Sequence, residues 1–258
     1  MIQGLMLSIV FCYLPLVLAH FFLKTKVWSK PVFLWFPIVL HTIFLIWLGG
    51  MQHLWASAAF GLSVLSAVLL IGFQILRRNP RMNALDVVHL PLGLLLMILA
   101  ALIPTQENIQ AQSWWVPLHI LLIFIGFGCF ALSFGQSLLF LFVRHRLKSK
   151  QLKGIGLFPS LERLDRFNYI GASLGFIALS AGVSAGWFWA QSVDAWKWDF
   201  GTIGSVALWI WYAISIHARL IFGRRMLWSA WFSVIGFLVM LVVLFCAYLI
   251  GGWHTGVL

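Results

Sequence analysis

The chain has 258 residues, of which 62% are hydrophobic and only 9% are charged, and its mean hydropathy is +1.00. A soluble domain of this size is not so apolar, so the composition excludes that class and predicts a protein with several membrane-spanning helices. The apolar runs are continuous rather than alternating, which excludes a closed β-barrel.

Eight apolar runs long enough to cross a bilayer as helices follow one another along the chain. They cover residues 4–24, 32–50, 54–76, 86–104, 117–143, 168–191, 202–222 and 228–250. We therefore expect an all-α, polytopic integral membrane protein with eight transmembrane helices and a single domain over residues 1–258. Residues 144–167 should hold a short amphipathic helix that leads into the sixth run. The first run has no basic leader, so we expect it to be retained rather than cleaved.

The net charge of +11 is distributed unevenly between the connections. Of the 17 Lys and Arg residues, all except Lys197 fall in every second loop. Cytoplasmic loops collect positive charge, so this pattern predicts that both termini lie outside the cytoplasm, in a plasma membrane such as the bacterial inner membrane. The charge thus indicates topology and contact with the lipid bilayer. It does not indicate a nucleic-acid partner.

The positions of the cysteines give no sign of cysteine chemistry. The three cysteines, Cys12, Cys129 and Cys246, each lie alone inside an apolar run, so they predict no disulfide framework. No C-x-x-C-H motif occurs, so we expect no covalent c-type haem on this chain.

The sixth run carries small residues at spacings of three and four, namely Gly171, Gly175, Ala178, Gly182 and Gly186. Such a stripe favours close packing against a neighbouring helix.

Ionisable residues inside a membrane are costly and are therefore candidates for function. The eight histidines can be sorted by predicted depth. Three fall at the outer face: His53, His119 and His254. Three fall close to the inner interface: His20, His89 and His217. The remaining two are His41, alone in the middle of the second run, and His145, in a basic loop.

Tryptophan gathers at the outer face, where nine of the 15 tryptophans are expected. The stretch GWFWAQSVDAWKWD, residues 186–199, holds the densest group: Trp187, Trp189, Trp196, Trp198 and, beside them, Asp199. An interfacial belt of tryptophans accounts for part of this excess. A flat aromatic platform beside paired imidazoles also suits non-covalent haem b, with two neutral histidines as axial ligands of the iron. A zinc site from His53, His119 and His254 is the alternative by ligand type, and it leaves the tryptophans unexplained.

Several segments resemble the cytochrome c assembly family, which includes the CcsA/ResC, CcmC and HemX proteins. The pattern is a histidine opening one span (Leu118-His119-Ile120), a loop ending Trp196-Lys197-Trp198-Asp199 and a histidine after the last span (Trp253-His254-Thr255-Gly256). SLERLDRFNYIGASLGF and WIWYAISIHARL are also similar to the family. The resemblance covers residues 112–258. The shortened tryptophan loop resembles the HemX-like branch most.

The resemblance implies where haem would bind. It implies that His119 and His254 are the axial haem ligands at the outer face, that the tryptophan stretch is the platform, and that His217 belongs to a site within the membrane. Depth alone adds His89 or His20 as companions of His217 in an inner relay site. The protein would then supply binding and orientation rather than bond-making groups, so we expect a haem-handling protein rather than an enzyme.

The partners that follow from the resemblance are haem, apocytochrome c and a ResB/Ccs-type membrane partner. An alternative is a HemX-type regulator that alters the level of glutamyl-tRNA reductase through the basic loop 144–167 without delivering haem. A transporter for another substrate is a weaker alternative, because no pair of spans broken by Gly or Pro marks a site at the midplane.

Overall fold

The computed structural model describes residues 2–18, 31–50, 54–55, 57–103, 113–151, 153–194, 196, 198–222 and 226–250. These residues form α-helices and two short 3-10 helices, and no strand occurs among them. The α-helices are α1 (Ile2–Leu18), α2 (Pro31–Gly50), α3 (Ala58–Leu76), α4 (Asp86–Leu102), α5 (Trp115–Lys148), α6 (Leu161–Ser192), α7 (Phe200–Phe222) and α8 (Met226–Ile250). The 3-10 helices are η2 (Pro80–Leu85) and η3 (Ile155–Leu157). The all-α prediction is confirmed.

Within the described ranges, six helical stretches are long and apolar enough to cross a membrane. They are Ala58–Leu76, Pro80–Leu102, Trp115–Lys148, Ile155–Ser192, Phe200–Ile221 and Leu227–Ala247. Two further apolar stretches, Ile2–Pro15 and Trp35–Gly50, are shorter. Length and composition of these helices support a membrane protein. The number of eight spans and the orientation of the termini remain predictions.

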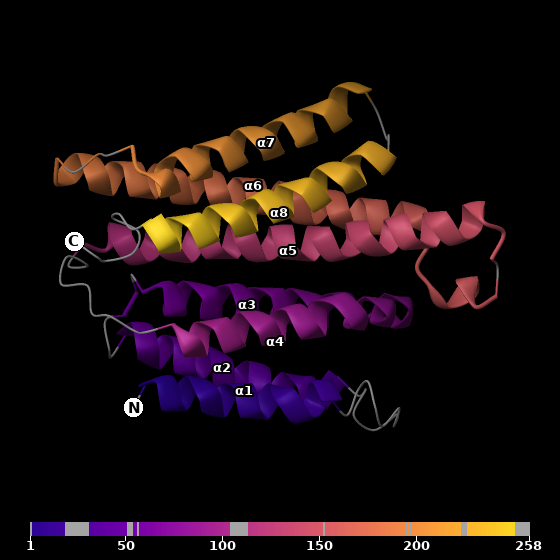
Figure 1. Ribbon diagram of the computed structural model, residues 1–258, viewed down its shortest axis with the longest axis horizontal. Helices are drawn as coiled ribbons and strands as arrows, with labels where there is room; N and C mark the ends of the chain where they lie inside the picture. Colours follow the sequence, from indigo (N-terminus) through magenta and orange to yellow (C-terminus); the bar gives the residue numbers. More distant parts are fainter. Residues whose placement is uncertain are drawn as a thin grey trace.

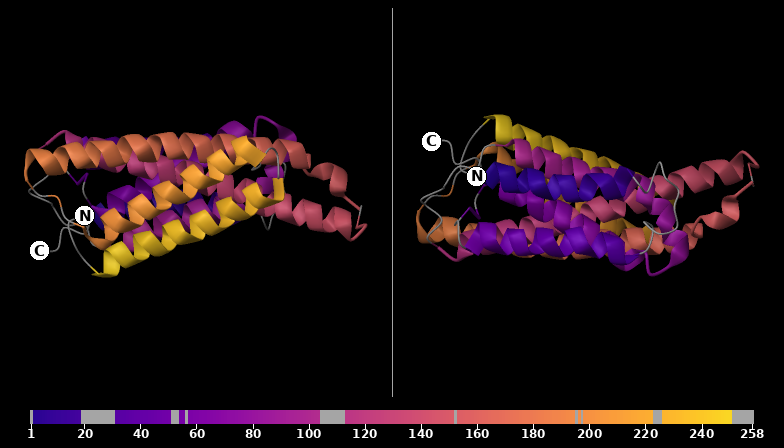
Figure 2. Two further views of the ribbon diagram at one scale, coloured as in Figure 1. Left: turned by 90° about the horizontal axis from the view of Figure 1, so that it is seen from above. Right: turned by 90° about the horizontal axis from the view of Figure 1, so that it is seen from below.

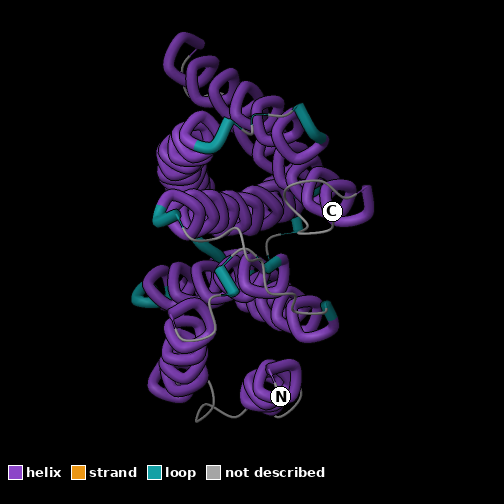
Figure 3. Tube along the Cα trace, turned by 90° about the vertical axis from the view of Figure 1, so that its left-hand side faces the viewer, coloured by secondary structure: helices purple, strands orange, loops and turns teal. Residues whose placement is uncertain are grey.

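The helices form an elongated bundle in which α5 lies near the middle (Figure 1). Helices α1 to α4 lie on one side of α5 and helices α6 and α7 on the other, and the end-on view shows the same stacking in layers (Figure 3). Successive helices alternate in direction, so α5 begins at the end of the bundle where α6 and α8 finish (Figure 1). We call this the tryptophan-rich end. The opposite end, where α5 finishes and α6 begins, is the basic end.

The hairpin of α5 and α6 extends past the other helices at the basic end (Figure 2). Helix α5 has 34 residues and is therefore about 50 Å long at 1.5 Å per residue, whereas the hydrocarbon core of a bilayer is about 30 Å thick. Helix α6 begins at Leu161, where the Ser160 hydroxyl accepts a hydrogen bond from the Arg163 amide. The short amphipathic helix predicted in the second part of residues 144–167 is thus the first part of α6, because this capped segment continues directly into the apolar part of the helix.

The backbones of α5 and α6 approach closely along the glycine stripe. A Cβ atom placed on Gly175 would lie 3.0 Å from the Gly126 carbonyl oxygen and closer still to the ring of Phe130. A Cβ atom on Gly171 would lie 3.1 Å from the carbonyl oxygen of Cys129. Only glycine leaves room for this contact, so the predicted packing role of the stripe is confirmed.

Replacing Gly175 with alanine should lower the free energy of unfolding by about 1–3 kcal/mol, because the added methyl group overpacks the contact between α5 and α6. Thermal unfolding of the purified protein in detergent measures the loss. Gly50→Ala is the matched control, since a Cβ atom there meets nothing within 4 Å. Equal unfolding temperatures for the two variants would contradict this account of the contact.

A buried ion pair explains how α4 can begin with a charged residue. The Arg77 Nε atom lies 3.4 Å from Asp86 Oδ1, and both side chains are almost fully buried. Arg77 also donates to the side-chain oxygens of Gln74 and Asn83, each at 3.4 Å. The pair joins the end of α3 to the start of α4 across η2, which satisfies charges that would otherwise be costly at this depth.

Candidate functional site

His119 lies in the second turn of α5, at the tryptophan-rich end. Its Nδ1 atom lies 2.7 Å from the Gly182 carbonyl oxygen in α6. A carbonyl oxygen can only accept, so Nδ1 carries the proton and Nε2 holds the lone pair. A Cβ atom on Gly186 would lie 2.6 Å from Nδ1, so the absence of a side chain there makes room for the ring. A metal-binding histidine is oriented by this kind of hydrogen bond.

Four aromatic side chains beside His119 form a row, which we call the aromatic row: Trp114, Trp115, Phe188 and Trp187. Trp114 stacks on Trp115 with ring centroids 3.8 Å apart. Trp115 then contacts Phe188 across the two helices at 5.4 Å, and Phe188 contacts Trp187 at 5.2 Å. The sequence prediction included Trp187 in the site but omitted the other three. The pairing of α5 with α6 brings Trp115 against Phe188 and so joins the two parts of the row.

The second half of the tryptophan stretch leads into α7. The rings of Trp196 and Trp198 meet edge to face with centroids 5.5 Å apart, and Trp198 is exposed. Asp199 Oδ1 accepts a hydrogen bond of 2.7 Å from the Thr202 amide, so Asp199 caps the start of α7. Trp189 is half-buried near the end of α6. The predicted platform therefore has two parts, one on α6 and one in the connection to α7.

The second predicted axial ligand, His254, lies outside the described residues, as do His20, His53 and Lys197. Helix α8 ends at Ile250, four residues before His254 in the sequence, at the tryptophan-rich end (Figure 1). The part of the chain that the structure describes therefore supplies one of the two predicted outer ligands, His119.

His217 lies on the exposed surface of α7, toward the basic end. Its Nδ1 atom lies 2.7 Å from the Ala213 carbonyl oxygen one turn earlier in the helix. As in His119, this contact places the proton on Nδ1 and the lone pair on Nε2. The side chain is exposed on the outside of the bundle. Its Nε2 atom carries the lone pair through which a neutral histidine can bind a metal.

His89, the other described residue of the predicted inner site, is fully buried in α4. Its ring stacks on Phe73 with centroids 5.0 Å apart, and its Nδ1 atom lies 3.2 Å from the Leu85 carbonyl oxygen. A Cβ atom on Gly135 of α5 would clash with the ring. Helices α4 and α7 lie on opposite sides of α5 (Figure 1), so the structure does not bring His89 and His217 together.

His41 belongs to a buried polar chain that sequence reasoning did not find. Its Nδ1 atom lies 3.3 Å from the Tyr13 hydroxyl, and its Nε2 atom lies 2.7 Å from the Ser63 hydroxyl. Ser63 in turn donates to the sulfur of Met97 at 3.6 Å. The chain joins α1, α2, α3 and α4, so each nitrogen of this buried imidazole has a partner within the bundle.

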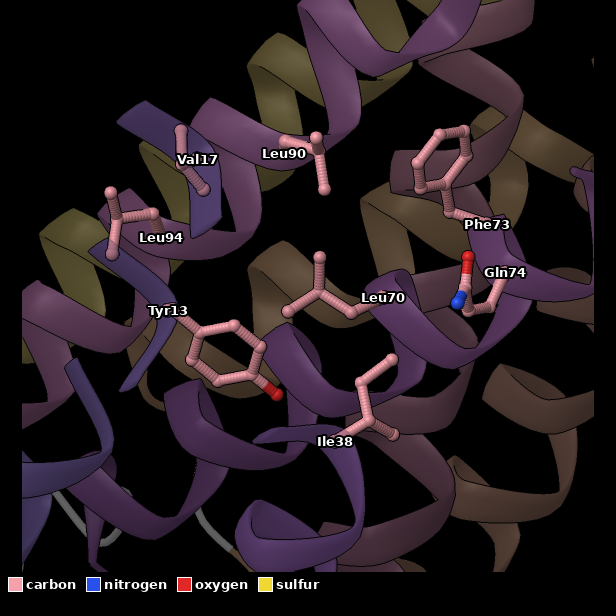
Figure 4. Close-up of a pocket in the computed structure, with 8 residues that line it drawn as sticks. All are labelled: Tyr13, Val17, Ile38, Leu70, Phe73, Gln74, Leu90 and Leu94. Carbon is pink, nitrogen blue, oxygen red and sulfur yellow. The ribbon is translucent and has the colours of Figure 1, made fainter. Parts of the chain in front are cut away.

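A small cavity lies beside this chain. Its lining is apolar apart from the side chains of Tyr13 and Gln74, as Figure 4 shows. The volume of about 10 Å³ open to the centre of a water molecule holds roughly one water. The cavity therefore has no room for haem.

A second polar network connects α5, α6, α7 and α8. Arg219 forms two parallel hydrogen bonds with Asp165, from Nη1 to Oδ1 at 2.8 Å and from Nη2 to Oδ2 at 2.7 Å. The guanidinium group also lies over the ring of Tyr169, 4.4 Å from its centroid. Asp165 and Tyr169 belong to SLERLDRFNYIGASLGF and Arg219 belongs to WIWYAISIHARL, so the two segments meet in one ion pair.

Asn168 extends this network into the bundle. Its side-chain oxygen accepts hydrogen bonds from the hydroxyls of Ser133 and Ser233, and its amide nitrogen donates to Ser229 at 3.2 Å. Arg219 also donates to Ser229 at 3.3 Å. This network holds the helix that carries His217 against α6 and α8.

The donor set at the tryptophan-rich end can be compared with the needs of a metal or haem. No group of three or more His, Cys, Asp or Glu side chains able to hold a metal ion occurs within the described ranges. Haem needs at most two axial ligands from the protein, together with apolar and aromatic contacts for the porphyrin. His119 beside the aromatic row fits one such ligand. The zinc alternative depends on His53 and His254, which lie outside those ranges.

Comparison with known proteins gives one family and a consistent set of relatives. A family model described as "Cytochrome C assembly protein" matches residues 4–254. A cytochrome c biogenesis protein CcsA from Chlamydomonas reinhardtii is 29% identical over 137 residues, which is 52% of this chain and 37% of the relative. The CcsA of a Synechococcus species is 33% identical over 97 residues, 36% of this chain and 31% of the relative.

A longer alignment is found with the CcsA of Prochlorococcus marinus, at 24% identity over 210 residues and 67% of each chain. The first two relatives are thus matched over about a third of their own length. The family model extends over nearly the whole chain, including the first hundred residues, whereas the resemblance in sequence motifs covered residues 112–258. The chain belongs to the cytochrome c assembly protein family.

Proposed function

We propose that this membrane protein handles haem in cytochrome c biogenesis, and that it binds haem at the tryptophan-rich end through His119 and His254. The observation that carries the proposal is the orientation of His119. The Gly182 carbonyl holds the proton on Nδ1, and the neighbouring rings provide an aromatic surface. An imidazole held in this tautomer can ligate iron through Nε2.

Haem is the cargo in this proposal rather than a permanent cofactor. Trp187, Trp189, Trp196 and Trp198 would contact the porphyrin, and Asp199 would position the last two by capping α7. His217 would serve an inner site open to the surface of α7. His20 could contribute to the inner site, whereas His89 could do so only if α4 and α5 separated around its buried ring.

Apocytochrome c and a ResB/Ccs-type membrane partner are the proposed recipients and collaborators. The predicted outer location of the tryptophan-rich end supports this role, because all basic residues except Lys197 lie in the loops of the opposite side. The relatives named above carry the name CcsA, and they lend no support to the HemX-type alternative that acts on glutamyl-tRNA reductase.

The proposal predicts that the double variant His119→Ala/His254→Ala loses haem from the outer site. Absorption spectra of the detergent-purified protein, oxidised and reduced, measure the Soret band and the low-spin bands of bis-histidine haem before and after addition of haem. His145→Ala is the matched control, because His145 is an exposed histidine near the basic end of α5. Spectra that remain the same in the double variant, or a wild-type protein that takes up no haem, would refute the outer site.

A further inference from the structure

The aromatic row has the position expected of a surface next to a ligand of His119. Trp115 precedes His119 by four residues on α5, so the two side chains lie on the same face of the helix. That face meets α6, where His119 contacts Gly182 and packs over Gly186, and where Trp115 contacts Phe188. Both contacts are thus made with a single stretch of α6.

The row is also open to a ligand. Trp114 is 61% exposed, Phe188 is 49% exposed and Trp187 is 45% exposed. A tryptophan that only anchors a helix in the interface places its own ring among the lipid headgroups. Here the rings of Trp114 and Trp115 stack on each other at 3.8 Å and continue into Phe188, so they present a continuous aromatic surface.

The distance along the helix suits a macrocycle. Trp115 lies about one helical turn, or roughly 6 Å, beyond His119 toward the end of the bundle. A flat tetrapyrrole held by His119 would thus have aromatic rings within about one helical turn of its ligand. Stacked or edge-to-face contacts with such rings are favourable.

We infer that the aromatic row is a second wall of the outer haem site, separate from the pair Trp196 and Trp198, and that Trp115 and Phe188 contact the porphyrin bound at His119. This inference rests on the proposed function. It assigns a binding role to Trp114, Trp115 and Phe188.

The test is a titration of the full-length protein in detergent with ferric protoporphyrin IX. It follows the Soret absorption for affinity and the Soret circular dichroism for contacts between the porphyrin and nearby aromatic rings. Trp115→Ala should weaken haem binding roughly two- to tenfold, as expected for the loss of aromatic contacts, and should reduce the dichroism. Trp115→Phe retains a flat ring and should restore part of both signals. Trp228→Ala is the matched control, because Trp228 is an exposed tryptophan at the start of α8, away from the row.

The outcomes separate the inference from the proposed function. If the wild-type protein binds no haem, the proposed function fails and this inference fails with it. If the wild-type protein binds haem through His119, but Trp115→Ala matches Trp228→Ala in affinity and dichroism, the row is an interfacial anchor and the inference alone is overturned. Weaker binding in Trp115→Ala than in Trp228→Ala, with partial recovery in Trp115→Phe, supports it.

Discussion

Replacing Arg219 with alanine is expected to lower the free energy of unfolding by about 3 kcal/mol or more. The substitution removes the bidentate partner of Asp165, whose side chain is only 3% exposed. A buried carboxylate without its counter-ion is strongly destabilising, and the loss of one partner of such a pair typically costs about 3–5 kcal/mol. The contact with the Tyr169 ring and the hydrogen bond to Ser229 are lost as well.

Denaturation of the detergent-purified protein, followed by circular dichroism, measures this effect. Arg166→Ala is the control, because Arg166 is an exposed residue of α6 next to Asp165 in the sequence. Arg219→Lys keeps the charge but cannot form the two parallel bonds, so it should lie between the wild type and Arg219→Ala. The double variant Asp165→Leu/Arg219→Met should recover much of the stability, since no charge is left buried. A loss in Arg219→Ala no larger than in Arg166→Ala would show that the pair contributes little.

A single methyl group on Gly186 is expected to weaken haem binding about 10- to 100-fold while leaving the protein folded. The new Cβ atom would lie 2.6 Å from the Nδ1 atom of His119, so the ring must move away from the Gly182 carbonyl. Loss of the hydrogen bond that orients a ligating histidine typically reduces metal affinity by about that factor. Alanine is also a better helix former than glycine, so α6 itself should not be weakened.

Haem titration together with thermal unfolding separates these two effects in Gly186→Ala. Gly4→Ala is the control, because a Cβ atom at Gly4 meets nothing within 4 Å. We expect Gly186→Ala to resemble the wild type in unfolding temperature and to differ from it in haem affinity. Unchanged affinity would mean that the His119 ring does not need this position. A large fall in unfolding temperature would mean that the glycine acts through helix packing instead.

The sequence predicted the helices well because the apolar residues that indicate a membrane helix belong to that same helix. The boundaries of α2 and α8 agree with the predicted runs to within two residues. Helix α6 was predicted to be too short, because Glu162, Asp165 and Arg166 interrupt its apolar pattern although Ser160 begins the helix. Hydropathy identifies the segment within the hydrocarbon layer, and a helix continues past it wherever its backbone hydrogen bonds are satisfied.

The candidate site was predicted only in part, because its contacts join distant segments. The residue types at His119 and in the tryptophan stretch indicated haem, but the hydrogen bond from His119 to Gly182 spans 63 positions. The pairing of Asp165 with Arg219 spans 54 positions. Spacing along one helix reveals which residues share a face, and it does not reveal which helix that face meets. The glycine stripe indicated close packing without indicating that α5 would be the partner.

The contact between α5 and α6 also bears on the order in which the molecule is made. These helices are consecutive and joined only by residues 149–160, so their pairing requires no later part of the chain. A nascent chain that has been synthesised as far as Ser192 already contains His119, the carbonyl that orients it and the glycine that makes room for it. Domains and helical hairpins that depend on local contacts can assemble during synthesis. His119 and the contacts that orient it can thus be in place before the ribosome has translated α7 and α8. Under the proposed function, the first haem ligand would be oriented before the second, His254, is synthesised.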